Sequence, residues 1–406
     1  MGNILEGVQV LDLAQVLAGP TVSRLMVELG ATVRKVEPLR GETGRYLPHV
    51  RDGWSGYFVQ QNRGKHSVAL DITHPDGAEV LDDLIEHSDV IVESFSPRNR
   101  ERLGFSPDQF RARWPSKVLC SISALGLDGP LANEVGYDTV GAAYSGVLGV
   151  SGQPGGPPGG FGVAIGDVMT GVHGFGGVMA ALFHRERTGE GNAVAVSLLD
   201  TYMHAHEINI QAVSGSGGDY EPSPSGQHHA TVVPAGIFDV GRGDYLFMAC
   251  VSDADWRKLA EAMGREELGV DERYATNQAR LDRREEVLGL IDRWFADFDD
   301  AETAVAHVKG YGVVAAPVLT VKEAMEFEHN RARRVVRTVP ERFWGEIDLP
   351  GVPIRLSHGG EELELQAPLL GEQTRAELTN TLGYGDARLD ELEAKGVIVC
   401  ADGTAP

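Results

Sequence analysis

"VQVLDLAQVLAGPTVSRLMVELGATVRKVE" (residues 8–37) contains three successive patterns that together decide the fold. Residues 8–14 are a short apolar run with β-branched residues, which predicts a strand. Apolar residues then recur at helical spacing from Val22 to Leu29, and residues 31–37 predict a second strand. A strand, a helix and a strand within so short a stretch form a βαβ unit, so we expect the two strands to pair in parallel.

The same alternation continues along much of the chain. It predicts an open, mostly parallel, Rossmann-like α/β sheet with helices on both faces. The further strands are expected at residues 67–72, 89–95, 117–123 and 193–199, and the further helices at 76–88, from about Asp167 to the "RTGEGN" segment, and from about Asp200 to Val213.

Two glycine-rich segments, 151–160 and 214–229, interrupt this pattern. The second segment predicts a domain boundary, because glycine, proline and serine clusters without periodicity are typical of loops. A predicted hairpin around Gly241 and Gly243 and two amphipathic helices follow, which indicates a smaller α+β unit. We therefore expect a large domain from 1–213, a linker at 214–225, a small inserted domain at 226–315, and a linker with a return to the large domain at 316–406.

Composition limits the class of protein. The chain has 406 residues and a net charge of −23, which disfavours nucleic acid and anionic membranes as partners. No continuous apolar run reaches the ~18 residues typical of a membrane span. Glu6 and Asp12 make the N-terminus unlike a secretory signal, and three widely spaced cysteines suit a reducing compartment. We expect a cytoplasmic protein without a membrane partner.

The negative charge is distributed unevenly. Residues 1–117 hold 14 Lys and Arg against 16 Asp and Glu, whereas the remainder holds 22 against 43. One interpretation is a solvated acidic surface on the later part of the chain. The other is that the nearly balanced N-terminal part receives an anionic ligand.

"GVAIGDVMTGVHGFGG" (162–177) places one carboxylate, Asp167, among small and apolar residues. Its position before a helical pattern predicts a helix N-cap. Burial raises a carboxyl pKa, by up to ~3–5 units in extreme cases, and the positive end of a helix opposes this rise. Such a site can hold a desolvated, nucleophilic anion, and Gly166 is expected to leave room for an acyl group. The other glycines are expected to permit close helix packing.

Other chemistries find less support in the sequence. "GVHGFGG" lacks the spacing of a dinucleotide-binding loop, and "SGSGG" lacks the flanking strand of a nucleophile elbow. His228 and His229 have no Asp, Glu, His or Cys partner at ligand spacing, so no metal site is expected.

Nine segments, taken together and in order, resemble the class III CoA-transferases, the group of formyl-CoA transferase and carnitine CoA-transferase. They include "LDLAQVLAGP", "NRGKHSVALDI", "VGYDTVGAAYSG" and "IGDVMTG". Each motif alone is weak, but nine in sequence are specific, and they cover nearly the whole chain. The segments are residues 11–20, 29–45, 62–72, 89–105, 135–146, 165–171, 187–200, 316–329 and 367–374.

The resemblance implies a fold and a reaction. The fold is a ring-shaped monomer, formed by a large α/β domain and an inserted small domain, and two rings interlock as a homodimer. The aspartate at the position of Asp167 attacks an acyl-CoA thioester and forms a mixed anhydride. The CoA thiolate returns to give an aspartyl-CoA thioester, and an acceptor carboxylate then takes over the CoA. The partners are an acyl-CoA donor and a carboxylic acid acceptor, with CoA thioester as substrate and no tightly bound cofactor.

The resemblance also implies roles for further residues. Tyr137 is expected near the nucleophile, and the loop around Gly226 is expected to close over the acyl group, where its backbone N–H groups can stabilise an oxyanion. Arg102 suits a phosphate as a charge-assisted donor. The positions expected to bind CoA are Val16, Ala18, Leu70, Ser94, Phe95 and Arg102.

The chain departs from the family pattern at several positions. Leu17 stands where some members have glutamine, although Gln15 lies two residues earlier. Pro38 replaces a basic residue that contacts CoA in some members, and the candidates to substitute for it are Arg34, Lys35 and Arg40. These departures leave the donor and the acceptor open.

Two alternatives follow from the same residues. The 2-methylacyl-CoA racemases resemble this chain in outline but use a histidine and an aspartate as paired bases. Their histidine corresponds to Tyr137, and a tyrosine with a pKa near ~10 is a poor base at neutral pH. The second alternative is a CoA-binding protein without turnover, which the presence of Asp167 disfavours.

Overall fold

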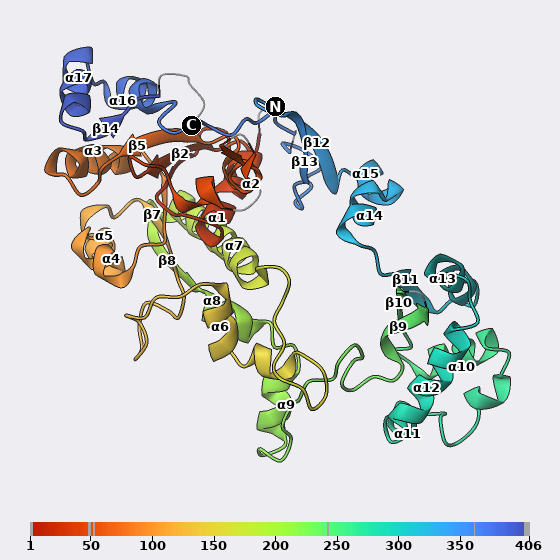
Figure 1. The fold of residues 1–406 in the computed structure, drawn as a ribbon. Helices are drawn as coiled ribbons and strands as arrows, with labels where there is room; N and C mark the ends of the chain where they lie inside the picture. The colour runs from red at the N-terminus through yellow and green to blue at the C-terminus, as the bar shows by residue number, and fades with distance from the viewer. Residues whose placement is uncertain (1–2, 48–49, 52, 242, 361, 402–406) are drawn as a thin grey trace. The chain divides into compact units, whose positions relative to one another are not determined.

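The computed structural model describes residues 3–47, 50–51, 53–241, 243–360 and 362–401, which divide into two compact units (Figure 1). The first unit contains residues 1–145, 161–207 and 331–406. The second unit contains residues 146–160 and 208–330. The small domain expected at 226–315 lies within the second unit.

A seven-stranded sheet forms the centre of the first unit, in the order β14-β5-β2-β1-β6-β7-β8. Every neighbouring pair is parallel except β14 and β5, which are antiparallel. The mostly parallel α/β sheet predicted from the sequence is thereby confirmed. The strands are β1 Gln9–Asp12, β2 Thr32–Glu37, β5 His66–Leu70, β6 Val90–Glu93, β7 Val118–Ser123, β8 Asn192–Ser197 and β14 Ile398–Val399.

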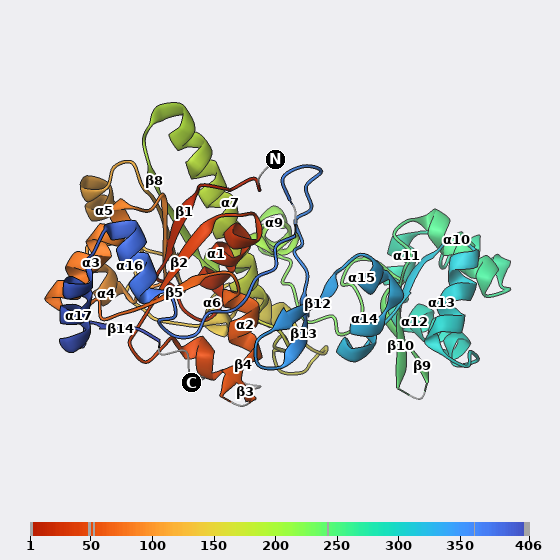
Figure 2. The ribbon, with the colours of Figure 1, turned by 90° about the horizontal axis from the view of Figure 1, so that it is seen from above.

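Helices cover both faces of this sheet. Successive residues of a strand point to opposite faces, so Val10 packs in the cluster with α1 and α7 while Leu11 packs in the cluster with α3, α16 and α17 (Figure 2). The helices of this unit are α1 Ala18–Glu28, α2 Gly56–Asn62, α3 Pro75–Glu86, α4 Pro97–Arg102, α5 Pro107–Arg113, α6 Asp138–Tyr144, α7 Ile165–Thr188, α8 Leu198–His204, α16 Thr374–Leu382 and α17 Asp386–Ala394. Two hairpins, β3–β4 (Val50–Arg51, Trp54–Ser55) and β12–β13 (Val336–Glu341, Gly345–Pro350), complete it.

Helix α7 packs closely on α1 through its glycines. A Cβ added at Gly171 would lie 2.6 Å from the Ala18 carbonyl oxygen, and one at Gly174 would lie 2.9 Å from Val22 Cγ2. This supports the expectation that these glycines permit helix packing. By length and composition alone α7 is apolar enough to span a membrane, but here one side of it packs on α1 and the sheet.

The second unit is built on the antiparallel sheet β11-β10-β9 and the helices around it. The predicted hairpin is confirmed, because β9 and β10 pair antiparallel on either side of residue 242. A core that includes Phe238, Trp256 and Phe295 packs against the sheet. The strands and α-helices are β9 Ala235–Gly241, β10 Asp244–Ala249, β11 Val314–Pro317, α9 Asn209–Gly215, α10 Asp253–Ala262, α11 Asn277–Leu281, α12 Arg284–Phe295, α13 Ala301–Gly310 and α14 Val321–Glu326. Helix α15, Glu328–Ala332, spans the boundary at residue 330, so its last two residues are counted with the first unit.

The predicted helix from Asp200 to Val213 is wrong as a single element. Helix α8 ends at His204 and α9 begins at Asn209. The chain leaves the first unit after Glu207, and the His206 ring hydrogen-bonds to the Ser145 carbonyl at 3.0 Å. This side-chain contact fixes an irregular segment that helical periodicity does not reveal.

Candidate active site

The sheet order creates a crevice between β1 and β6. From β1 the chain proceeds outward through β2 to β5, and from β6 it proceeds in the opposite direction through β7 to β8. The connections after β1 and β6 therefore diverge, and ligands of open α/β sheets bind at this switch point, outside the carboxyl ends of the strands. A cavity of about 550 Å³ lies there, within the usual size of small-molecule sites.

Asp167 lines this cavity from the first turn of α7. The prediction that it is the N-cap is wrong, because Ala164 is the N-cap and Asp167 is the third helical residue. Its own N–H donates to Asp138 Oδ1 at 2.8 Å, so another carboxylate satisfies the helix terminus. Across the described part of the chain, no group hydrogen-bonds to the Asp167 carboxylate.

The environment of Asp167 raises its pKa. Burial is the larger cause and the nearby Asp138 charge adds to it, which brings the pKa of Asp167 to about 6. At pH 7 the carboxylate is still mostly ionised, since the pH exceeds this pKa by about one unit. The side chain is thus a partly desolvated anion that faces a cavity, which is the state that a covalent carboxylate catalyst requires.

Asp138 and Tyr202 build the support for Asp167, and the sequence did not reveal this role. The Tyr202 hydroxyl accepts from the Gly166 N–H at 3.1 Å and donates to Asp138 Oδ2 at 3.0 Å. A Cβ added at Gly166 would lie 2.2 Å from Tyr202 Cε2, so Gly166 makes room for this ring and not for an acyl group as expected. In the "VGYD" segment the sequence drew attention to Tyr137, as the counterpart of a racemase histidine, and assigned no role to Asp138.

Six of the predicted site residues meet at this cavity. Val16 and Ala18 follow β1, Ser94 and Phe95 follow β6, and Tyr137 precedes α6. Tyr137 is 81% exposed, so its ring is available to a ligand. Together with Asp167, these residues come from loops and helix starts that the sequence separates by up to 151 positions. The parallel sheet gathers them at the carboxyl ends of its strands.

Three predicted residues lie elsewhere. Leu70 is 1% exposed in the core against α3 and α16, and Arg102 is exposed at the end of α4, outside the cavity lining. Gly226 belongs to the second unit, where its N–H donates to the Gly152 carbonyl at 3.1 Å. Arg100, two residues before Arg102, does line the cavity, with its guanidinium paired to Glu93 at 2.8 Å.

The candidates to replace the basic residue at Pro38 differ in availability. The Arg34 guanidinium bonds to Glu377, Gln9 and Thr381, and Lys35 is fully buried. Arg40 is exposed. In the described residues no group of three or more His, Cys, Asp or Glu side chains is arranged to hold a metal ion.

Comparison with known proteins identifies the family. The model of CoA-transferase family III matches residues 5–374. The formyl-CoA:oxalate CoA-transferase of Streptomyces avermitilis is 34% identical over 98% of this chain and 100% of that protein. The succinyl-CoA–D-citramalate CoA-transferase of Chloroflexus aurantiacus is 31% identical over 97% of this chain and 98% of that protein.

A solved structure agrees with these relatives. The crystal structure of a CaiB/BaiF family protein from Brucella suis superposes with a TM-score of 0.82 at 30% identity, covering 94% of this chain and 100% of that one. The residues matched by the family model include both Asp167 and the loops after β1 and β6. The chain therefore belongs to CoA-transferase family III and is a class III CoA-transferase.

Proposed function

We propose that this enzyme moves CoA from an acyl-CoA thioester to a free carboxylic acid through intermediates bound covalently to Asp167. One observation carries the proposal: the Asp167 carboxylate faces a cavity lined by the loops expected to bind CoA and has no described hydrogen-bond partner. A carboxylate anion in such surroundings is a nucleophile toward a thioester carbonyl.

The proposed reaction conserves atoms and charge at each step. An Asp167 oxygen attacks the thioester carbonyl carbon, the C–S bond breaks, and a mixed anhydride and CoA thiolate form. The thiolate attacks the aspartyl carbonyl, releases the first acid and leaves an aspartyl-CoA thioester. The acceptor carboxylate attacks the carbonyl of this thioester, the C–S bond breaks, and a second mixed anhydride and CoA thiolate form. The thiolate finally attacks the acceptor's acyl carbon of this anhydride, which forms the new acyl-CoA and releases the Asp167 carboxylate.

The surrounding residues are assigned supporting roles in this proposal. Val16, Ala18, Ser94 and Phe95 form the wall for the CoA chain, and Tyr137 lies at the reacting end. The loop around Gly226 is proposed to donate N–H groups to the oxyanion. Gly226 itself has to give up its hydrogen bond to Gly152 to do so. Leu70 and Arg102 stay in the proposal as positions implied by the family resemblance.

Short acids are the proposed substrate class. The curated relatives are named for formyl-CoA with oxalate and for succinyl-CoA with D-citramalate. By this analogy the donor is the CoA thioester of a short acid such as succinate, and the acceptor is a short dicarboxylic or hydroxy acid.

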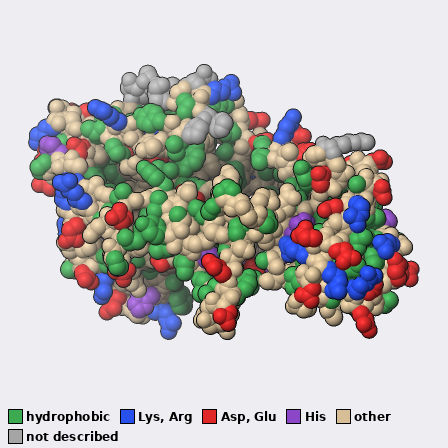
Figure 3. Space-filling view, turned by 60° about the horizontal axis from the view of Figure 1, so that its bottom comes forward, with side chains coloured by type: hydrophobic (Ala, Val, Ile, Leu, Met, Phe, Trp, Pro, Cys, Tyr) green, Lys and Arg blue, Asp and Glu red, His purple; other side chains and the backbone are tan. Residues whose placement is uncertain are grey.

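Assembly and location complete the proposal. We propose an interlocked homodimer of ring-shaped chains in the cytoplasm. Exposed apolar side chains support a partner surface on the first unit, and Figure 3 shows hydrophobic side chains spread over the face of that unit. The exposed apolar residues of the first unit include Tyr144, Phe161, Val163, Ile165, Val168, Val172 and Met203.

A CoA exchange assay tests the function. The purified enzyme is incubated with pairs of acyl-CoA donors and free acids, and mass spectrometry follows the new acyl-CoA. We expect CoA to appear on the acceptor acid. Loss of α-deuterium from a branched acyl-CoA without any exchange would instead establish racemisation, and binding without either reaction across a broad acceptor panel would establish a non-catalytic CoA-binding protein.

A further inference from the structure

The loop between β1 and α1 contains a strained residue at the cavity wall. Val16 has a φ of +69°, and only Arg334 shares a positive φ among the other described non-glycine residues. The left-handed region is unfavourable for an L-residue, and a β-branched side chain is rarely found there. Contacts outside the loop must therefore hold Val16 in this conformation.

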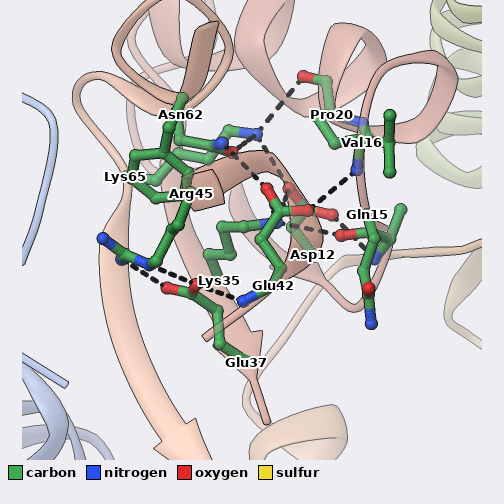
Figure 4. Close-up of polar contacts among 12 residues, drawn as sticks. Asp12, Gln15, Val16, Pro20, Lys35, Glu37, Glu42, Arg45, Asn62 and Lys65 are labelled. Atoms are coloured by element: carbon green, nitrogen blue, oxygen red, sulfur yellow. Dashed lines mark hydrogen bonds and ion pairs between the residues drawn. The ribbon is translucent and has the colours of Figure 1, made fainter. Parts of the chain in front are cut away.

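Buried charged side chains bind the backbone of this loop. Glu42 Oε2 accepts from the Val16 N–H at 2.8 Å, and Lys35 Nζ donates to the Ala14 carbonyl at 2.9 Å (Figure 4). Asp12 Oδ1 accepts from the Ala14 N–H at 3.0 Å. Of these three side chains, only Glu42 binds the strained residue itself.

Further contacts hold the Glu42 carboxylate in place. Glu42 is 1% exposed. Its Oε1 accepts a hydrogen bond from Asn62 Nδ2 at 3.2 Å and lies 3.5 Å from Lys35 Nζ. Both carboxylate oxygens thus face donors only. A glutamine here keeps the shape, but in either orientation its NH₂ group faces a donor.

The charges of Glu42 and Asp167 both act on one further side chain, Tyr57. The pKa of the Tyr57 phenol is raised by burial first, then by the Asp167 charge and then by the Glu42 charge. Thr43, the next residue after Glu42, lines the cavity beside Val16.

We propose that Glu42 is a positioning residue for the CoA site, because its carboxylate holds the Val16 N–H and so keeps the wall of the cavity in its left-handed form. The inference rests on the proposed function only in taking CoA as the ligand of this cavity. A purely structural Glu42 would stabilise the chain without being coupled to the conformation of Val16.

A double-mutant cycle separates these roles. Glycine adopts a positive φ freely, so Val16→Gly removes the strain that Glu42 opposes. We measure the Kd of CoA by calorimetry, and the KM and kcat of exchange, for the wild type, Glu42→Gln, Val16→Gly and the double variant. We expect Glu42→Gln to raise the Kd and the KM by about tenfold with Val16 present, but by no more than about threefold in the Val16→Gly background. The kcat should change less than the KM.

A matched variant controls for the loss of a buried carboxylate. Glu341 is also buried, and among the described residues its carboxylate accepts from the N–H groups of Trp54, Phe343 and Trp344. Glu341→Gln should lower the unfolding midpoint without raising the Kd of CoA. Should Glu42→Gln not fold, Glu42→Asp, which keeps the charge but shortens the reach, enters the same cycle.

The outcomes separate this inference from the proposed function. Equal effects of Glu42→Gln in the wild-type and Val16→Gly backgrounds would overturn it, as would an equal rise in Kd for Glu341→Gln. Absence of exchange by the wild-type enzyme would refute the proposed reaction. The Kd values, which need no turnover, would still decide the role of Glu42.

Discussion

Asp167 and Asp12 are two aspartates of the same unit that the fold treats in opposite ways. Burial raises the pKa of both side chains. At Asp12 the charges of Lys35 and Lys65, with hydrogen bonds from Lys65 and Ser23, outweigh burial and lower the pKa below its usual value. At Asp167 the nearby charge is a second carboxylate, and the pKa rises to about 6. The sign of the nearby charge therefore distinguishes the structural carboxylate, Asp12, from the reactive one, Asp167.

The same comparison revises the interpretation of charge in residues 1–117. Many of the basic residues there are buried against acidic partners, so the near balance of charge reflects internal pairing more than a surface for an anion. The buried pairs include Lys65 with Asp12, Arg45 with Glu37 and Arg100 with Glu93.

Removing the reactive carboxylate has the largest expected effect. Asp167→Ala should lower kcat of exchange at least about a thousandfold, since loss of a covalent nucleophile typically removes most of the rate. Calorimetry should find the Kd of CoA within about threefold of the wild type, because no described group relies on this carboxylate for a hydrogen bond. If the Asp167→Ala variant exchanged CoA as fast as the wild type, Asp167 would not be the reactive carboxylate that the comparison with Asp12 makes it.

Removing the counter-charge of the structural carboxylate should cost stability. Lys65 Nζ bonds to Asp12 at 2.8 Å and to the Asn62 oxygen at 2.9 Å, and Lys65→Met leaves part of this cluster unpaired. Breaking a buried ion pair costs about 3–5 kcal/mol, which urea unfolding at pH 7 measures. Lys117→Met is the control, because Lys117 is partly exposed and, among the described residues, its ammonium bonds to the Glu86 carbonyl and not to a buried carboxylate. Equal losses for the two variants would contradict the account.

The pH dependence of turnover should report the raised pKa of Asp167. The reactive form is the anion, so kcat/KM should fall about tenfold per pH unit below pH 6 and level off above it. Asp138→Asn keeps an oxygen for the Asp167 N–H but removes the second cause of the raised pKa, so the acid limb should move to lower pH. A limb that stays in place or moves upward would show that Asp138 does not act on Asp167 by charge.

The packing of α7, the helix that carries Asp167, against α1 should give the smallest effects on stability. Gly171 of α7 meets the Ala18 carbonyl and Thr21 of α1, so Gly171→Ala should lower the free energy of unfolding by about 1–3 kcal/mol. Gly176 lies in the same helix with nothing within 4 Å of an added Cβ, so Gly176→Ala should raise it by about 0.5–1 kcal/mol. Urea unfolding of both variants compares them directly, and equal shifts would contradict the packing described for α7.

Local patterns predicted the elements that depend on local physics. The βαβ unit at residues 8–37, the helix that carries Asp167 and the β9–β10 hairpin follow from apolar periodicity and turn residues. Strand β14 has two residues, Ile398 and Val399, which is too short for any periodicity to show.

The site was only partly predictable, because its support is tertiary. The lone carboxylate among small and apolar residues drew attention to Asp167, and the family resemblance drew attention to the loops after β1 and β6. The structure gathers them at one cavity. Tyr202 and Asp138 come from different helices and meet only in the fold, so spacing along the chain could not link them. Arg100 lines the cavity as a buried residue, and Glu93 and the Ile122 carbonyl hold its guanidinium. Sequence alone does not distinguish it from the exposed Arg102.

Trapping of the covalent intermediate tests the central claim most directly. The enzyme is mixed with an acyl-CoA donor and then with hydroxylamine, which converts an aspartyl anhydride or thioester into a hydroxamate. Peptide mass spectrometry should find the hydroxamate on Asp167, only when acyl-CoA is present, and never in the Asp167→Asn variant. An unmodified Asp167 peptide in an enzyme that loses no exchange activity to hydroxylamine would contradict the account.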